Sequence, residues 1–138
     1  MSALSGKYVL VIEDEALISL ELADLLNAYD AKVVGPLHDS AAALSYIRST
    51  AIDCAVLDIQ LGTGADVSAV ADTLAQAEVP FIFVTAYADH DILSRHPSRP
   101  VVKKPYEQRD VIAALSAALA SGGIARKNQT TTAARTIS

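Results

Sequence analysis

The chain has 138 residues, 51% of them hydrophobic, which suits one globular domain with a sizeable buried core. Its formal net charge is −5 at pH 7, whereas sequence-independent binding to nucleic-acid phosphates needs clustered Lys and Arg. The composition therefore argues against nucleic acid as a direct partner.

Cysteine content and hydropathy bear on the protein's location. Cys54 is the only cysteine, so an internal disulfide is excluded, and its apolar neighbours predict a small buried side chain. No apolar stretch reaches the roughly 20 residues that span a bilayer, and the first residues do not resemble a signal peptide. We expect a cytoplasmic protein that does not insert into a membrane.

Short apolar runs and helical patterns alternate along the chain. The runs predict five strands, at Tyr8 to Ile12, Lys32 to Gly35, Cys54 to Leu57, Pro80 to Val84 and Pro100 to Val102. Apolar residues at helical spacing predict helices over 17–26, 41–47, 67–74 and 111–119. This alternation predicts an α/β fold, a doubly wound five-stranded parallel sheet with helices on both faces.

Helix boundaries and the chain end carry weaker signals. Asp39 with Ser40, and Asp66, precede the second and third helices as N-caps. A fourth helix within 88–99 should be short or irregular, because only Ile92 and Leu93 offer it an apolar face. We expect a domain over residues 1–121 and a disordered tail over 122–138, a Thr-rich stretch without periodicity.

Polar residues end four of the five predicted strands. In chain order they are Glu13 and Asp14, Asp58, Thr85, then Lys103 and Lys104. Because ligands bind beyond the carboxyl ends of parallel strands, these side chains should meet at one edge of the sheet.

The three acids suggest a metal ion. Neighbouring carboxylates repel each other unless a cation lies among them, and oxygen ligands without His or Cys favour Mg²⁺. The alternative is that Glu13 and Asp14 only favour the start of the first helix, whose dipole attracts acids.

Asp58 is the strongest candidate for chemistry. It ends the apolar run CAVL, where a charge is costly unless solvated, paired or used. A carboxylate can attack phosphorus to form an acyl phosphate. Thr85 could donate its hydroxyl to a phosphoryl oxygen, and Lys104 could supply a positive charge.

Four motifs, taken in order, resemble the receiver domain of two-component response regulators. They are ED at 13–14, LD at 57–58, VTA at 84–86 and KKP at 103–105, and the likeness runs from Lys7 to Ala120. It implies a flavodoxin-like strand order 2-1-3-4-5.

The resemblance also implies roles for residues. Asp58 would be the phosphorylated residue, and Thr85 and Lys104 would contact the phosphoryl group. Lys103 would face solvent, and the peptide bond before Pro105 would be cis. The implied Mg²⁺ ligands are Glu13, Asp14, Asp58 and the backbone carbonyl of Gln60.

The chain departs from the usual receiver pattern at the switch. Val101 stands where many receivers carry an aromatic residue, which leaves Tyr87 and Tyr106 as further switch candidates, Tyr106 more as a packing residue. The segment FVTAY, residues 83–87, partly resembles the FATGUY subgroup of single-domain receivers, which is associated with alphaproteobacteria and atypical sensor kinases.

The histidines and two arginines receive no chemical role. None of His38, His90 and His96 has a second metal ligand at a suitable spacing, so we expect surface residues. Arg95 and Arg99 should form a solvated basic patch.

The leading hypothesis is a stand-alone response regulator. It would take a phosphoryl group from a sensor histidine kinase or a histidine phosphotransfer protein, and signal by conformational change to an unknown protein target. A relay shuttle or a phosphate sink would use the same chemistry. A receiver-like binding module, a fragment of a longer protein and a phosphatase remain alternatives. The phosphatase is disfavoured because Gln60 stands where such enzymes place a second carboxylate.

Overall fold

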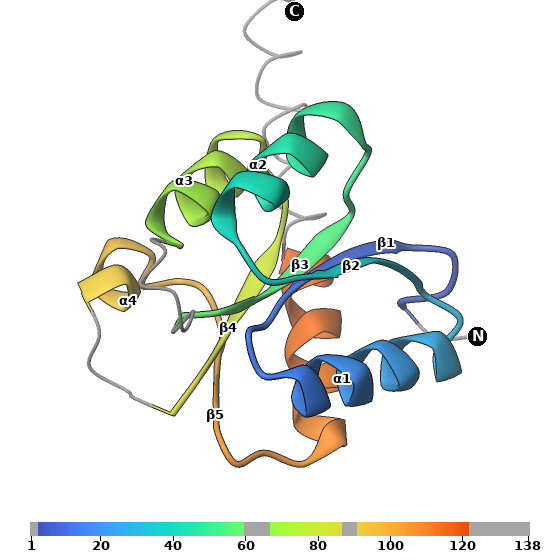
Figure 1. The fold of residues 1–138 in the computed structure, drawn as a ribbon. Coiled ribbons are helices and arrows are strands. Elements are labelled where there is room, and N and C mark those ends of the chain that lie inside the picture. The colour runs from blue at the N-terminus through green and yellow to red at the C-terminus, as the bar shows by residue number, and fades with distance from the viewer. Residues whose placement is uncertain (1–2, 60–66, 87–90, 122–138) are drawn as a thin grey trace, which may run out of the picture.

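The computed structural model describes residues 3–59, 67–86 and 91–121, and strands and helices alternate through them (Figure 1). The strands are β1 (Tyr8–Ile12), β2 (Lys32–Leu37), β3 (Cys54–Asp58), β4 (Phe81–Thr85) and β5 (Val101–Lys103). The labelled helices are α1 (Ala16–Ala28), α2 (Ser40–Ser49), α3 (Ser68–Gln76) and α4 (Asp91–Arg95). A last helix covers residues 108–121. The expected tail, residues 122–138, lies outside the described residues.

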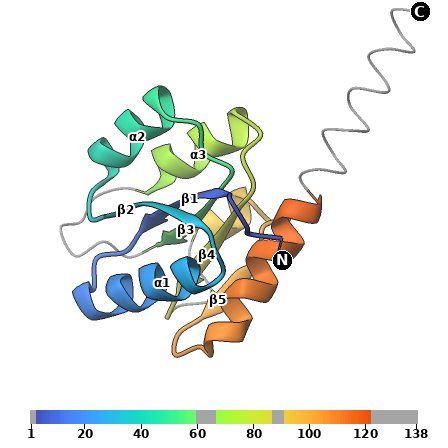
Figure 2. The same cartoon turned by 90° about the vertical axis from the view of Figure 1, so that its right-hand side faces the viewer.

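The five strands form one parallel sheet in the order β2-β1-β3-β4-β5, which confirms the predicted fold. Helices cover both faces: α2 and α3 lie on one, and α1 and the last helix on the other (Figure 2). No helix among the described residues combines the length and the hydrophobicity needed to cross a membrane.

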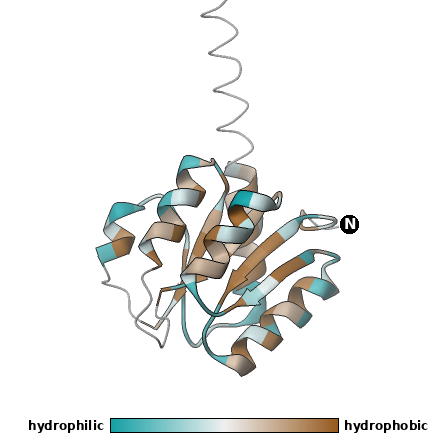
Figure 3. Cartoon of the chain, turned by 45° about the horizontal axis from the view of Figure 1, so that its top comes forward, coloured by the Kyte–Doolittle hydropathy of each residue, from teal (hydrophilic) through white to brown (hydrophobic). Residues whose placement is uncertain are grey.

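The sheet separates two apolar cores, so its strands are hydrophobic on both faces (Figure 3). In β4, Phe81 and Phe83 pack towards α2 and α3, while Ile82 and Val84 pack towards α1 and the last helix. Cys54 is fully buried in β3, as predicted, and burial raises the pKa of its thiol to about 12. Two-sided burial explains why the sequence shows continuous apolar runs instead of alternation.

Strand β2 runs two residues beyond its predicted end at Gly35. It continues through Pro36 to Leu37, with an irregular register opposite β1 between Leu10 and Ile12. Gly35 has φ +105°, and a Cβ there would lie 2.7 Å from the Leu37 nitrogen. The chain therefore needs glycine at this bend.

Two helix predictions are confirmed. Asp39 caps α2, because its Oδ1 accepts a hydrogen bond from the Ala42 N–H at 2.8 Å. Helix α4 has only five residues, and of these only Ile92 is buried. The predicted cap Asp66 lies outside the described residues.

Candidate functional site

Three polar residues are buried where strands end at one edge of the sheet. Glu13 directly follows β1, Asp58 ends β3 and Thr85 ends β4. Because the strands are parallel and adjacent, their carboxyl ends meet at this edge, as the sequence predicted.

Lys104 completes this group from beyond β5. Its side chain is only 12% exposed, and its Nζ lies 2.9 Å from Glu13 Oε1 and 3.4 Å from Asp58 Oδ2. The Lys104 N–H donates to the Thr85 carbonyl at 2.8 Å, and the Lys104–Pro105 bond is cis, as the resemblance implied. Lys103 is exposed. We call Glu13, Asp58 and Lys104 the acidic site.

Charge and burial oppose each other in the acidic site. Burial, with Asp58 nearby, raises the pKa of Glu13 from 4.5 to about 7, although Lys104 acts in the opposite direction. Burial alone would lower the pKa of Lys104, but its contacts with Glu13 and Asp58 outweigh this and raise the pKa overall. The ammonium therefore stays charged, while Glu13 exchanges its proton near neutral pH.

Neighbouring segments hold Glu13 in place. The Glu13 N–H donates to the Leu37 carbonyl at 3.0 Å, and His38 Nδ1 lies 2.8 Å from the Glu13 carbonyl oxygen. The Glu13 carboxylate also accepts the N–H of Glu15, the N-cap of α1, at 3.2 Å. One acid thus supports the start of α1 while it belongs to the acidic site.

Sequence reasoning missed two residues near the site. Glu15 Oε1 lies 3.3 Å from Lys104 Nζ, and the EDE run at 13–15 could have pointed to it. His38 Nδ1 lies within hydrogen-bond distance of the Glu13 carbonyl oxygen, and no local sequence pattern predicts a contact between residues so far apart in the chain.

The donor atoms of the acidic site suit a hard cation. Glu13 Oε1 is buried without a hydrogen bond of good geometry, although Lys104 lies beside it. In the described part of the chain, no three Asp, Glu, His or Cys side chains form a ready-made metal cluster. Mg²⁺ retains several waters and needs only one or two carboxylates, so Glu13 and Asp58 fit this ion. Asp14 is half-buried, and Gln60 lies outside the described residues.

The switch candidates differ in their surroundings. Val101 is exposed on β5, and Tyr87 lies outside the described residues. Tyr106 packs against the core, and burial, with Glu13 as a second cause, raises its pKa to about 12. Beside the acidic site lies a hollow of about 380 Å³ lined by Glu15, Ile18, Glu21, Ala86, Lys104, Pro105 and Tyr106.

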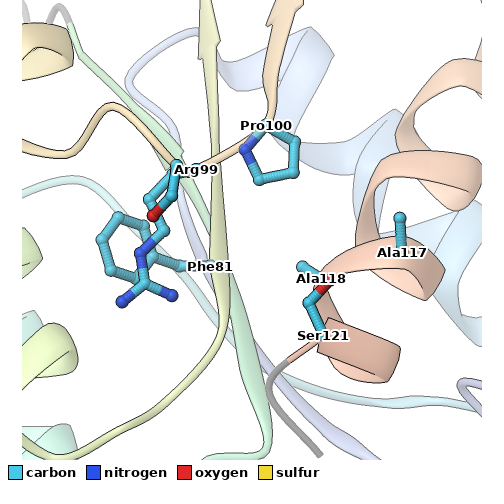
Figure 4. Close-up of a pocket in the computed structure, with 7 residues that line it drawn as sticks. Phe81, Arg99, Pro100, Ala117, Ala118 and Ser121 are labelled. Carbon is cyan, nitrogen blue, oxygen red and sulfur yellow. The ribbon is translucent and has the colours of Figure 1, made fainter. Parts of the chain in front are cut away.

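The surface prediction for the histidines is wrong for His96. Its side chain is 10% exposed, and its Nε2 lies 3.0 Å from Asp72 Oδ1. Arg95 also pairs with Asp72, and the Arg99 guanidinium lies 4.4 Å from the centre of the Phe81 ring (Figure 4). Each arginine therefore contacts another side chain, whereas the sequence predicted a basic patch in contact with solvent. His90 lies outside the described residues.

A parallel sheet with buried acids, a hydroxyl and a lysine at its carboxyl edge defines a receiver-type α/β protein. The profile of the response regulator receiver domain matches residues 9–116. The chain belongs to the response regulator receiver domain family.

Individual relatives agree with this assignment. The chain is 32% identical over 124 residues to the phyllosphere-induced regulator PhyR of Methylorubrum extorquens, covering 88% of the chain and 46% of PhyR. The solution structure of SdrG from Sphingomonas melonis Fr1 is 39% identical, with TM-score 0.71 and coverage of 86% of this chain and 98% of SdrG. The PhyR receiver domain of Erythrobacter litoralis is 32% identical, with TM-score 0.70 and coverage of 86% and 93%. The chain spans about half the length of the curated relatives it matches, PhyR and the transcriptional regulatory protein PdtaR of Mycobacterium tuberculosis.

Proposed function

We propose that Asp58 accepts a phosphoryl group from a histidine of a sensor kinase or phosphotransfer protein. The observation that carries this proposal is the position of Asp58, buried at the end of β3 with Lys104 Nζ 3.4 Å from its Oδ2. A buried carboxylate beside a lysine and a hydroxyl suits nucleophilic attack on phosphorus.

The reaction needs few groups. A carboxylate oxygen of Asp58 attacks the phosphorus, a new O–P bond forms, and the P–N bond to the donor imidazole breaks. The electron pair of that bond returns to the imidazole. Lys104 balances charge on the phosphoryl oxygens, and the buried hydroxyl of Thr85 donates to one of them. Glu13, Asp14, Asp58 and the Gln60 carbonyl would hold Mg²⁺, which neutralises charge on the transferring group.

Helix α1 presents exposed apolar side chains next to the acidic site. Leu17 and Leu20 of α1 are 70% and 61% exposed, and α1 begins directly after the site acids. These two exposed leucines, about one helical turn apart beside the site, are candidates for contact with a protein donor. Other residues of α1, Ile18 and Glu21, line the hollow beside Lys104 and Tyr106.

The regulator would signal through another protein. We infer a cytoplasmic receiver domain over residues 1–121 that changes conformation on phosphorylation and does not turn over an external substrate. Tyr87, Val101 and Tyr106 stay candidates for the switching residue. A relay shuttle or phosphate sink would use the same site, and only partner experiments separate these roles.

Intact-mass measurement tests the proposal. The protein is incubated with acetyl phosphate and Mg²⁺, beside Asp58→Asn as the matched control. We expect one phosphoryl addition that requires both Asp58 and Mg²⁺. Addition to the Asn variant would place the phosphoryl group elsewhere. No addition to the natural chain, repeated with a phosphorylated histidine kinase as donor, would favour a binding module.

A further inference from the structure

A second charged cluster connects α3 to the end of α4, away from the acidic site. Asp72 of α3 accepts a hydrogen bond from Arg95, the last residue of α4, and its Oδ1 lies 3.0 Å from Nε2 of His96. We call Asp72, Arg95 and His96 the clasp. One carboxylate thereby fixes two consecutive residues where α4 ends.

The clasp also touches the strand that carries Thr85. The His96 ring packs edge-on against Phe81 with 5.5 Å between ring centroids, and it lies 6.1 Å from the Phe83 ring. Phe83 stands two residues before Thr85 in β4. A continuous set of contacts therefore leads from the acidic site, along β4, to His96 and Asp72.

Among the residues that the structure describes, α4 buries few side chains. It has five residues and buries only Ile92, with Leu93 partly buried against the core. After it, Arg99 stacks on Phe81, the ring that His96 also contacts (Figure 4). A helix with so few buried contacts is drawn from the low-stability end of a fold, so two hydrogen bonds can decide its position.

We propose that the clasp holds α4 in the unphosphorylated arrangement and that phosphorylation of Asp58 must open it. This inference rests on the proposed function. In the structure the clasp is closed while Lys104 contacts the Glu13 and Asp58 carboxylates directly. A phosphoryl group on Asp58 would compete for Lys104 and for the hydroxyl of Thr85, and so would pull on the strand that supports His96.

Reciprocity sets the direction of the effect. If phosphorylation opens the clasp, opening the clasp by mutation must favour phosphorylation by the same free energy. Asp72→Ala removes both hydrogen bonds and keeps a strong helix former in α3. We expect beryllofluoride, which with Mg²⁺ mimics the phosphoryl group, to bind this variant about three to ten times more tightly than the natural chain, as partly exposed ion pairs and modest couplings allow.

Two further variants separate the clasp from a general loss of stability. His96→Phe keeps an aromatic ring against Phe81 and Phe83 but loses the bond to Asp72, so it should also tighten beryllofluoride binding and should add nothing to Asp72→Ala. Arg109→Ala breaks an exposed pair with Glu107, in which Arg109 Nε lies 2.7 Å from Glu107 Oε2, and should leave beryllofluoride affinity unchanged.

Hydrogen exchange provides a readout that needs no phosphorylation. Amides of α4 should exchange faster in Asp72→Ala, and in the natural chain treated with beryllofluoride and Mg²⁺, while β3 and β4 keep their protection. If the natural chain accepts phosphoryl groups but Asp72→Ala and His96→Phe bind beryllofluoride no more tightly than it does, the clasp proposal alone would be overturned. Unchanged α4 exchange in Asp72→Ala would overturn it too. Failure of the natural chain to accept a phosphoryl group would overturn the proposed function instead.

Discussion

The acidic site and the clasp use the same charged groups in different surroundings. In the acidic site two buried carboxylates share one lysine, whereas in the clasp one partly exposed carboxylate contacts both Arg95 and His96. Burial shifts the pKa of Glu13 from 4.5 to about 7 in the first cluster. The side chains of Asp72 and Arg95 in the second are 38% and 49% exposed, so water screens their attraction.

The buried acidic site sets the protonation of reactive groups, whereas the partly exposed clasp affects the position of α4. A buried cluster with more negative than positive charge stores repulsion that a cation or a proton can relieve. A partly exposed ion pair is screened by water, so it contributes less free energy and opens more easily. The predictions below test this contrast, from the largest expected effect to the smallest.

Replacing Lys104 should have the largest effect. Lys104→Met leaves Glu13 and Asp58 buried without their ammonium, so we expect the free energy of unfolding at pH 8 to fall by about 3 kcal/mol. The loss should shrink as the pH falls below about 7, because Glu13 is then protonated. Urea unfolding measures it, with Lys103→Met as the matched control on the exposed neighbour. If both variants lost the same free energy of unfolding, the buried pairs of Lys104 would contribute no more to stability than an exposed lysine does.

Neutralising Glu13 should change the pH dependence of stability. Its pKa is higher in the folded chain, so the folded state binds more protons between pH 4.5 and about 7. The free energy of unfolding of the natural chain, measured in EDTA, should therefore fall as pH rises through this range. Glu13→Gln should remove this fall and be about 2 kcal/mol more stable than the natural chain at pH 8. A slope that persists in Glu13→Gln would assign it to another group.

Mg²⁺ should stabilise the chain, and more so at high pH. At ten times its dissociation constant a ligand adds about 1.4 kcal/mol to the free energy of unfolding. Protons compete for Glu13 below its pKa of about 7, so the same Mg²⁺ concentration should raise the melting temperature less at pH 6 than at pH 8. Asp58→Asn should respond weakly at both values. If Mg²⁺ raised the melting temperature equally at pH 6 and pH 8, Glu13 would not be a ligand of the ion.

Breaking the exposed pair should have the smallest effect. Arg95→Ala keeps the His96 contact with Asp72 and loses only a screened ion pair, so we expect about 0.5 kcal/mol at low salt. Thermal unfolding at low and at high NaCl measures it, and the difference from the natural chain should vanish at high salt. A loss as large as that of Lys104→Met would show that water does not screen the Arg95–Asp72 pair.

The sheet could be predicted from the sequence because its strands are buried on both faces. All five strands appear within two residues of their predicted ends, since short continuous apolar runs are typical of strands covered on both sides. The largest difference is at β2, where Gly35 and Pro36 predicted a stop. Proline is tolerated there because β2 is an edge strand, which needs fewer ladder hydrogen bonds.

The acidic site was predictable because parallel strands bring their ends to one edge of the sheet. Glu13, Asp58, Thr85 and Lys104 each lie at a strand end, and parallel topology brings strand ends together. The contacts of His38 with Glu13 and of His96 with Asp72 were not predictable. Both join residues more than twenty positions apart, and packing alone makes them neighbours.

The burial of Cys54 has a practical consequence for spectroscopy. It is the only thiol in the chain, it is fully buried in β3, and its pKa is about 12, so maleimides should scarcely react with it in the folded protein. A cysteine placed at exposed Ser94 in α4 could therefore carry a fluorophore or spin label while Cys54 remains in place. The opening of the clasp could then be followed in real time on an otherwise unaltered chain.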